Sequence, residues 1–206
     1  MRTRIKICGI TSPEIARYAV DAGADAIGLV FYPSSSRYLT LDQAIEINRT
    51  ALPFVAQVGV FVNPEKQVMD RILSAVHLDY LQFHGDETPA YCASFGIPYI
   101  KAIRVAESTD LLALEKQYQD AAGLLLDSHI SDRYGGTGKS FAWGRAQYGG
   151  QKPIILAGGL STDNVQAAIA AASPYGVDVS SGVETEGVKA PAKMRAFCQN
   201  VNRQSQ

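Results

Sequence analysis

Eight short apolar runs recur along the 206-residue chain, and their spacing constrains the fold more than any other feature. Their starts lie about 19 to 30 residues apart, and their lengths and β-branched content are typical of strands. Most gaps between them carry a helical pattern. The runs are 3–9, 25–32, 54–62, 80–85, 99–105, 123–129, 153–159 and 176–182. Because strands that alternate with helices form a parallel sheet with right-handed crossovers, eight such units predict an α/β fold, a single-domain (βα)8 TIM barrel over residues 1–206.

Helix-start signals fill the gaps between the runs. Ser12-Pro13-Glu14 combines a capping serine, a proline suited to the first turn and an acid near the positive helix end, and Gly23 suits the end of that helix. Later helices are predicted to open at Thr40, Pro64, Thr88 and Ser161, and the last to span 190–201. No G-x-G-x-x-G fingerprint follows the first run, which disfavours an open dinucleotide-binding sheet.

Composition and charge exclude several classes of partner. The net charge is −1, from 19 Lys and Arg against 20 Asp and Glu, and no basic block occurs, so neither nucleic acid nor a membrane is a predicted partner. No run reaches the roughly 18 apolar residues that span a bilayer, and the N-terminus lacks the apolar core of a signal peptide. Cys8, Cys92 and Cys198 are odd in number and far apart, which fits a reducing cytoplasm. The sequence predicts a cytoplasmic protein and leaves a monomer and a homodimer both open.

The last two apolar runs end in small residues. The run 153–159 ends in Gly158-Gly159, and the run 176–182 ends in Ser180-Ser181-Gly182. A strand that stops in small residues and leads into a helix presents backbone N–H groups, and two such ends side by side form an anion site. Paired phosphate-binding loops after the seventh and eighth strands are typical of (βα)8 barrels. These two ends therefore predict a phosphate site.

Two side chains capable of proton transfer end other runs. Cys8 ends the first run beside Gly9; a lone cysteine is usually a small buried hydrophobe, but at a strand end it could be a thiolate nucleophile or a general base. Asp127 follows the apolar segment 124–126 and is either a turn or cap residue or an acid/base group whose pKa burial raises. Because barrel active sites collect at the carboxyl ends of the strands, both residues are candidates for catalysis.

Other polar residues near the strand ends fit a small-molecule site without a metal. His84, His129 and Asp127 show no metal-ligand spacing, so the histidines are predicted to be structural groups or substrate contacts. Arg37 lies on a turn-rich loop, where its guanidinium is either solvated or holds a carboxylate through two hydrogen bonds. The segment 133–140 lacks the first glycine of a Walker loop and is interpreted instead as a glycine-rich lid.

Taken in order along nearly the whole chain, these motifs resemble those of the phosphoribosylanthranilate isomerase family. GGTG alone is a weak signal, but KICG opening the first strand, an aspartate then GGTG after the sixth, and AGGL followed by DVSSGVE are together specific. The segments that carry the resemblance are 6–9, 23–37, 59–63, 82–87, 124–143, 156–165 and 176–184.

The resemblance implies an Amadori rearrangement of an aminoaldose phosphate, a phosphosugar, to an aminoketose phosphate, with neither cofactor nor metal. It implies that Asp127 is the general acid that opens the sugar ring and that Cys8 is the general base that removes the C2′ proton. Arg37 would hold the anthranilate carboxylate, Asp178 would contact the sugar hydroxyls, and His84 would be a weaker substrate contact. The backbone residues implied to bind the phosphate are Gly158, Gly159, Ser180, Ser181 and Gly182.

Other classes stay open beside this resemblance. One is a different phosphosugar barrel. An indole-glycerol-phosphate synthase needs a lysine and a glutamate at the strand ends, and the glutamate is lacking here. A pentose-phosphate epimerase needs a set of metal ligands that the chain does not clearly supply. An isomerase of the histidine-pathway aminoaldose would carry out the same rearrangement. A non-catalytic phosphate-ligand binder is disfavoured because both Cys8 and Asp127 are present.

Overall fold

The structure, a computed structural model, describes residues 2–50, 53–106, 108–127 and 143–203. Its barrel strands are β1 (Arg4–Cys8), β2 (Ala26–Val30), β3 (Ala56–Phe61), β4 (Tyr80–Phe83), β5 (Tyr99–Arg104), β6 (Gly123–Asp127), β7 (Ile154–Ala157) and β8 (Gly176–Val179). Its α-helices are α1 (Pro13–Ala22), α2 (Leu41–Asn48), α3 (Lys66–Ala75), α4 (Pro89–Ala93), α5 (Leu111–Gln117), α6 (Val165–Ala172) and α7 (Pro191–Arg203). Short elements are the 3₁₀ turns η1 (Trp143–Ala146) and η2 (Ser181–Val183) and a hairpin of β9 (Glu184–Thr185) and β10 (Val188–Lys189).

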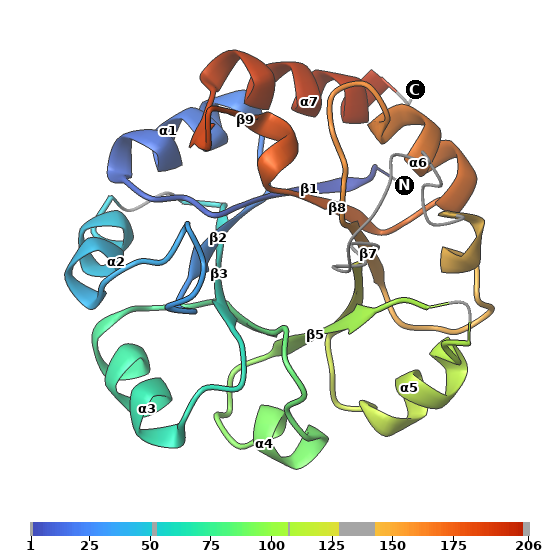
Figure 1. Ribbon diagram of the computed structural model, residues 1–206, viewed down its shortest axis with the longest axis horizontal. Coiled ribbons are helices and arrows are strands. Elements are labelled where there is room, and N and C mark those ends of the chain that lie inside the picture. The colour runs from blue at the N-terminus through green and yellow to red at the C-terminus, as the bar shows by residue number, and fades with distance from the viewer. Residues whose placement is uncertain (1, 51–52, 107, 128–142, 204–206) are drawn as a thin grey trace.

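The strands pair in parallel in chain order from β1 to β8, and β8 pairs with β1, which closes the barrel. Figure 1 looks along the barrel and shows the helices as a ring around it, with α1 and α7 side by side. The (βα)8 barrel predicted from the sequence is confirmed. Each strand lies within its predicted run. β6 fills the described part of its run, and every other strand is shorter than its run by one to three residues, because the ends of these runs belong to the loops.

Side chains along each strand alternate between the helix-facing core and the barrel interior. On β1, Ile5 and Ile7 belong to the main core under the helices, whereas Cys8 packs in a separate interior cluster with Val30 and Val60. Lys6, two residues before Cys8, shares its face of the strand. The alternation therefore places one set of side chains in the core between the strands and the helices, and the other set in the interior of the barrel.

The predicted helix starts agree with the structure except at α6. Ser12 Oγ accepts from the Ile15 N–H, and Thr40 forms a capping box with Gln43, so both caps act as expected. The predicted start of α6 at Ser161 is wrong, because its N-cap is Asn164. The Asn164 amide bonds both the Ser161 N–H and the Gly159 carbonyl, at 2.8 and 2.9 Å, and so holds the residues before α6 as a loop.

A buried ion pair outside the barrel interior fixes the loop after β4. The Lys101 ammonium donates to Glu87 Oε2 at 3.0 Å and to the carbonyls of Phe83 and Gly85. The Glu87 carboxylate in turn accepts from the backbone N–H groups of Asn63 and Gly85. Because every one of these bonds anchors the segment that carries His84, this pair sets the direction of the loop.

We expect Glu87→Gln to lower the free energy of unfolding by about 3 kcal/mol, because it leaves the Lys101 ammonium buried without its counterion. Urea unfolding followed by circular dichroism measures the change. The matched control is Asp70→Asn, which removes the exposed Lys66–Asp70 pair and should cost less than about 1 kcal/mol. Equal losses in the two variants would contradict a special role for the buried pair.

Candidate active site

His84 and Asp127 meet at the carboxyl ends of their strands. Asp127 ends β6 and His84 directly follows β4, so the two side chains reach each other across the end of β5. His84 Nε2 lies 3.0 Å from Asp127 Oδ2. The Gln82 amide donates to His84 Nδ1 over 3.1 Å, so Nε2 carries the ring hydrogen and donates to the Asp127 carboxylate. With side chains 24% and 19% exposed, the pair lies at the solvent-accessible mouth of the barrel.

Cys8 ends β1 in apolar surroundings. It contacts Val30 and Val60, and a Cβ added to Gly28 would lie 2.7 Å from its Sγ, so only glycine fits beside the thiol. Burial raises the pKa of Cys8, while the ammonium groups of Lys6 and Lys189 limit the increase. The surroundings of Cys8 therefore combine desolvation with two opposing positive charges.

Asp178 faces β1 across the strand pair that closes the barrel. Lys6 and Asp178 are register partners of β1 and β8, and Lys6 Nζ donates to Asp178 Oδ2 at 2.9 Å. Both side chains are buried, and Asp178 Oδ1 has no hydrogen-bond partner within the described part of the chain. Burial lowers the pKa of Lys6, but Asp178 and Cys8 together raise it by more, so the pKa of Lys6 lies above its ordinary value.

Arg37 is held at the mouth of the barrel by Glu184 of β9. Its Nε and Nη2 donate to the two carboxylate oxygens of Glu184 at 2.7 and 2.5 Å. A Cβ on Gly9, the residue after Cys8, would lie 2.4 Å from Arg37 Cδ, so the guanidinium stem crosses directly over the end of β1. Lys189 also donates to Glu184, and burial lowers the pKa of this lysine. Arg37 is therefore oriented rather than solvated.

The loops after β7 and β8 touch each other. A Cβ on Gly182 would lie 1.9 Å from the Leu160 carbonyl oxygen, and Gly158 and Gly159 both have positive φ angles, at 79° and 65°. In the described segments, the backbone N–H groups of Gly159, Ser181 and Gly182 donate to no protein acceptor. Two adjoining loops with open N–H groups have the form of an anion site.

Ser180 joins this pair of loops to Cys8. Its hydroxyl donates to the Cys8 carbonyl at 3.1 Å, and its own carbonyl accepts from Lys189 at 3.2 Å. The structure thus brings Cys8, Arg37, Asp178 and the loop after β8 together, with His84 and Asp127 as a second group from β4 and β6.

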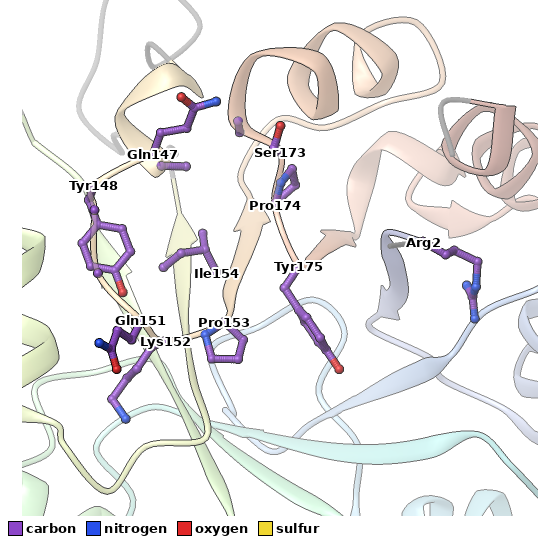
Figure 2. Close-up of a pocket in the computed structure, with 14 residues that line it drawn as sticks. Arg2, Gln147, Tyr148, Gln151, Lys152, Pro153, Ile154, Ser173, Pro174 and Tyr175 are labelled. Atoms are coloured by element: carbon purple, nitrogen blue, oxygen red, sulfur yellow. The ribbon is translucent and has the colours of Figure 1, made fainter. Parts of the chain in front are cut away.

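A cavity of about 690 Å³ lies at the opposite end of the barrel (Figure 2). Its lining includes Lys152 and Pro153 before β7 and Tyr175 before β8, which mark the amino ends of these strands. Its cations, Arg2 and Lys152, donate to Asp25 and to backbone carbonyls, respectively. This cavity is therefore separate from the residues that the sequence singled out.

Some predictions fall outside the described residues: the lid at 133–140 and the role of His129. Across the described ranges, no three His, Cys, Asp or Glu side chains gather in a way that could hold a metal ion. Across the same ranges, no helix combines the length and apolarity needed to cross a membrane.

The fold and this group of side chains define a (βα)8-barrel enzyme class with acid and base candidates at the strand ends. The family model of N-(5'-phosphoribosyl)anthranilate (PRA) isomerase matches residues 5–200, so the chain belongs to this family, as its motifs indicated.

Relatives match over nearly full length. The N-(5'-phosphoribosyl)anthranilate isomerase of Azotobacter vinelandii is 54% identical over 199 residues, which cover 96% of this chain and 97% of that protein. The Thermotoga maritima phosphoribosyl anthranilate isomerase has a TM-score of 0.85 at 39% identity, with 97% of this chain and 98% of that chain covered. A structure of such an isomerase with reduced 1-(o-carboxyphenylamino)-1-deoxyribulose 5-phosphate has a TM-score of 0.83 at 36% identity, with 97% and 98% covered.

Sequence reasoning did not single out Gln82, Glu184 or Lys189. Gln82 lies two residues before His84, so strand alternation alone indicates that both face the same side. Glu184 and Lys189 carry no such signal, because their bonds to Arg37 and Ser180 depend on how the β9–β10 hairpin folds.

We expect Glu184→Gln to lower stability by about 3 kcal/mol at neutral pH, because Arg37 and Lys189 lose a buried counterion. Burial raises the pKa of Glu184, but Arg37 and Lys189 lower it by more, so the folded-state pKa lies below the unfolded value. Its contribution is therefore complete above about pH 5 and is lost as pH falls through the folded pKa.

Urea unfolding between neutral and acidic pH tests this expectation. The difference between the wild-type protein and Glu184→Gln should shrink steadily as the pH falls below about 5. The control, Glu186→Gln, changes an exposed carboxylate of the same hairpin and should stay within about 0.5 kcal/mol of wild type. A Glu184→Gln difference that does not depend on pH would contradict the assignment.

Proposed function

We propose that this protein catalyses the isomerisation of N-(5'-phosphoribosyl)anthranilate to the corresponding 1-deoxyribulose 5-phosphate derivative, an Amadori rearrangement in tryptophan biosynthesis. Membership of the isomerase family over residues 5–200 supports the reaction. One observation carries the proposal. Cys8 and Asp127, a thiol and a carboxyl group, are the last residues of β1 and β6, and both side chains face inward at the same end of the barrel. The rearrangement needs one group that gives a proton and another that takes one.

The acid in this proposal is Asp127. Its protonated carboxyl group gives a proton to the furanose ring oxygen, the C1′–O bond breaks, and the nitrogen lone pair forms a Schiff base at C1′. His84 donates its Nε2 hydrogen to the carboxyl group and fixes its direction, and Gln82 fixes the tautomer of His84. The interaction with His84 supports Asp127 as a positioned acid rather than a turn residue.

The base in this proposal is Cys8. Its thiolate removes the C2′ proton, and the electrons of that C–H bond form the C1′=C2′ bond of an enolamine as the iminium charge is neutralised. Protonation at C1′ and loss of the C2′ hydroxyl proton then give the ketone. Apolar contacts with Val30 and Val60 keep water away from the thiol, which favours transfer to the substrate.

The substrate contacts are part of the same proposal. The phosphate would accept hydrogen bonds from the backbone of Gly158, Gly159, Ser180, Ser181 and Gly182, which the contact between the two loops supports. Arg37 would bind the anthranilate carboxylate while Glu184 orients its guanidinium. Asp178, with one oxygen on Lys6, would accept from a sugar hydroxyl through Oδ1.

We further propose a cytoplasmic protein that is a monomer or a homodimer and has no nucleic-acid or membrane partner. The three cysteines, Cys8, Cys92 and Cys198, are all free and buried, which supports a reducing compartment. A dimeric isomerase is known from Thermotoga maritima, so a homodimer has a precedent in the family. Sedimentation equilibrium distinguishes the two assemblies.

The fluorescence of phosphoribosylanthranilate, formed in situ from anthranilate and phosphoribosyl pyrophosphate by the transferase, follows its consumption in the presence of EDTA. We expect the wild-type protein to consume it and Asp127→Asn to lower kcat by about 10²–10⁴-fold while ligand still binds, because the amide cannot give the ring-opening proton. The control is Asp86→Asn, which changes an exposed carboxylate in the loop after β4 that carries His84. Near-normal turnover of Asp127→Asn would remove it as the acid.

We expect Cys8→Ser to lower kcat by a similar factor, about 10²–10⁴-fold, because a serine hydroxyl is a far weaker acid than a thiol and supplies almost no anionic base at neutral pH. Cys92→Ser, at the buried cysteine of α4, controls for the loss of a thiol from the core. If Cys8→Ser keeps full turnover, the base lies elsewhere. If the wild-type protein converts the histidine-pathway aminoaldose but not phosphoribosylanthranilate, that aminoaldose replaces the proposed substrate.

A further inference from the structure

We propose that Lys6 is a positioning residue for the general base: its ammonium group, held by Asp178, stabilises the thiolate form of Cys8. The inference rests on the proposed function, since it explains how the base named there is formed. It adds a role for a residue that the proton-transfer steps do not themselves use.

The geometry begins with β1. Lys6 and Cys8 are two residues apart on one strand, so their side chains leave the same face toward the barrel interior. Lys6 is the register partner of Asp178 across the β1–β8 pair. The Lys6 ammonium group donates a hydrogen bond of 2.9 Å to Asp178 Oδ2. Both side chains are less than one-tenth exposed, so water does not screen their interaction with the thiol.

The charged groups that face Cys8 come from four parts of the chain. They are Lys6 on β1, Arg37 in the loop after β2, Asp178 on β8 and Lys189 on β10. Glu184 binds both Arg37 and Lys189. Three cations and two carboxylates leave one positive charge in excess, which a thiolate at Cys8 would neutralise.

Within the described residues, Lys6 makes fewer hydrogen bonds than Lys189 or Arg37, so it keeps N–H groups for the thiolate. Lys189 uses its three N–H directions on the Ser180 carbonyl, the Ser180 hydroxyl and Glu184. Arg37 donates hydrogen bonds from Nε and Nη2 to Glu184 and from Nη1 to the Ser36 hydroxyl. Lys6 makes one hydrogen bond, to the Asp178 carboxylate, and its positive charge lowers the pKa of Cys8.

A purely structural role does not account for this pair. A buried ion pair contributes little net stability compared with apolar side chains of the same size. Asp178 also keeps one buried oxygen without a partner in the described residues, which a pair built for stability would have satisfied. A pair that holds one charge beside a reacting thiol, and keeps one carboxylate oxygen able to accept a further hydrogen bond, explains both observations.

The two partners have opposite effects on the thiol. Burial raises the pKa of Cys8, Lys6 lowers it, and Asp178 raises it. Removing Lys6 should therefore raise the pKa of Cys8, and removing the Asp178 charge should lower it, because the thiolate becomes the main counterion of Lys6. General disruption of the site would not produce shifts of opposite sign.

The test is a carbon-13 NMR titration of cysteine-labelled protein, with the Cys8 Cβ signal assigned by its absence in Cys8→Ser. Lys6→Met should raise the midpoint of Cys8 by at least about one pH unit, Asp178→Asn should lower it, and Lys6→Arg should restore it toward wild type. Lys101→Met, at another buried lysine paired with a carboxylate, is the control and should leave the Cys8 midpoint unchanged.

The pH dependence of kcat/KM provides a second readout. In Lys6→Met its acidic limb should move to higher pH by the same amount as the Cys8 midpoint, and Lys6→Arg should reverse the shift. A Cys8 midpoint unchanged in Lys6→Met, or shifts of the same sign in Lys6→Met and Asp178→Asn, would overturn the proposal. If Lys6→Met does not fold, Asp178→Asn decides, since no shift or an upward shift there also overturns it.

Failure of this inference is distinguishable from failure of the proposed function. The NMR titration reports the charge state of Cys8 without any turnover. A Lys6-dependent midpoint together with full activity of Cys8→Ser would keep the Lys6 interaction and reject Cys8 as the base. An unshifted midpoint with an inactive Cys8→Ser would keep the base and reject Lys6.

Discussion

The pairing of β1 with β8 closes the barrel, and the candidate site depends on it. This pairing sets Lys6 opposite Asp178 and brings the Ser180 hydroxyl within 3.1 Å of the Cys8 carbonyl. The first strand contributes the thiol, and the last strand contributes the carboxylate and half of the anion-binding loops. Because these residues lie about 170 positions apart in sequence, only a closed sheet brings them into contact.

Burial of charge inside this barrel is balanced rather than avoided. Ionised groups cost several kcal/mol each to bury, and each one here has a partner: Lys6 with Asp178, and Lys189 and Arg37 with Glu184. The apolar contacts of Cys8 with Val30 and Val60 then provide a low-dielectric wall in which one unbalanced charge has a large effect. The apolar packing that stabilises the barrel thus also makes the protonation state of the Cys8 thiol sensitive to the charges of neighbouring side chains.

Elements with strong local signals were predictable, and elements whose local signal is weak or ambiguous were not. The strands and the capped starts of α1 and α2 follow from residue pattern and capping chemistry alone. The start of α6 was misjudged, because the Asn164 amide closes a loop that the serine and threonine before it appeared to cap. The β9–β10 hairpin was missed, since strands of two residues carry no recognisable period.

Residue patterns along the chain were enough to predict the barrel, the family and the candidate residues at the strand ends, because alternation and short motifs are local properties. The roles of Cys8 and Asp127 remain proposals. The groups that surround each candidate became known from the folded chain: His84 beside Asp127, Glu184 bound to Arg37, and Lys6 with Asp178 near Cys8. Hydrogen bonds and ion pairs act over a few ångströms, and closing the barrel is what makes distant residues neighbours at that range.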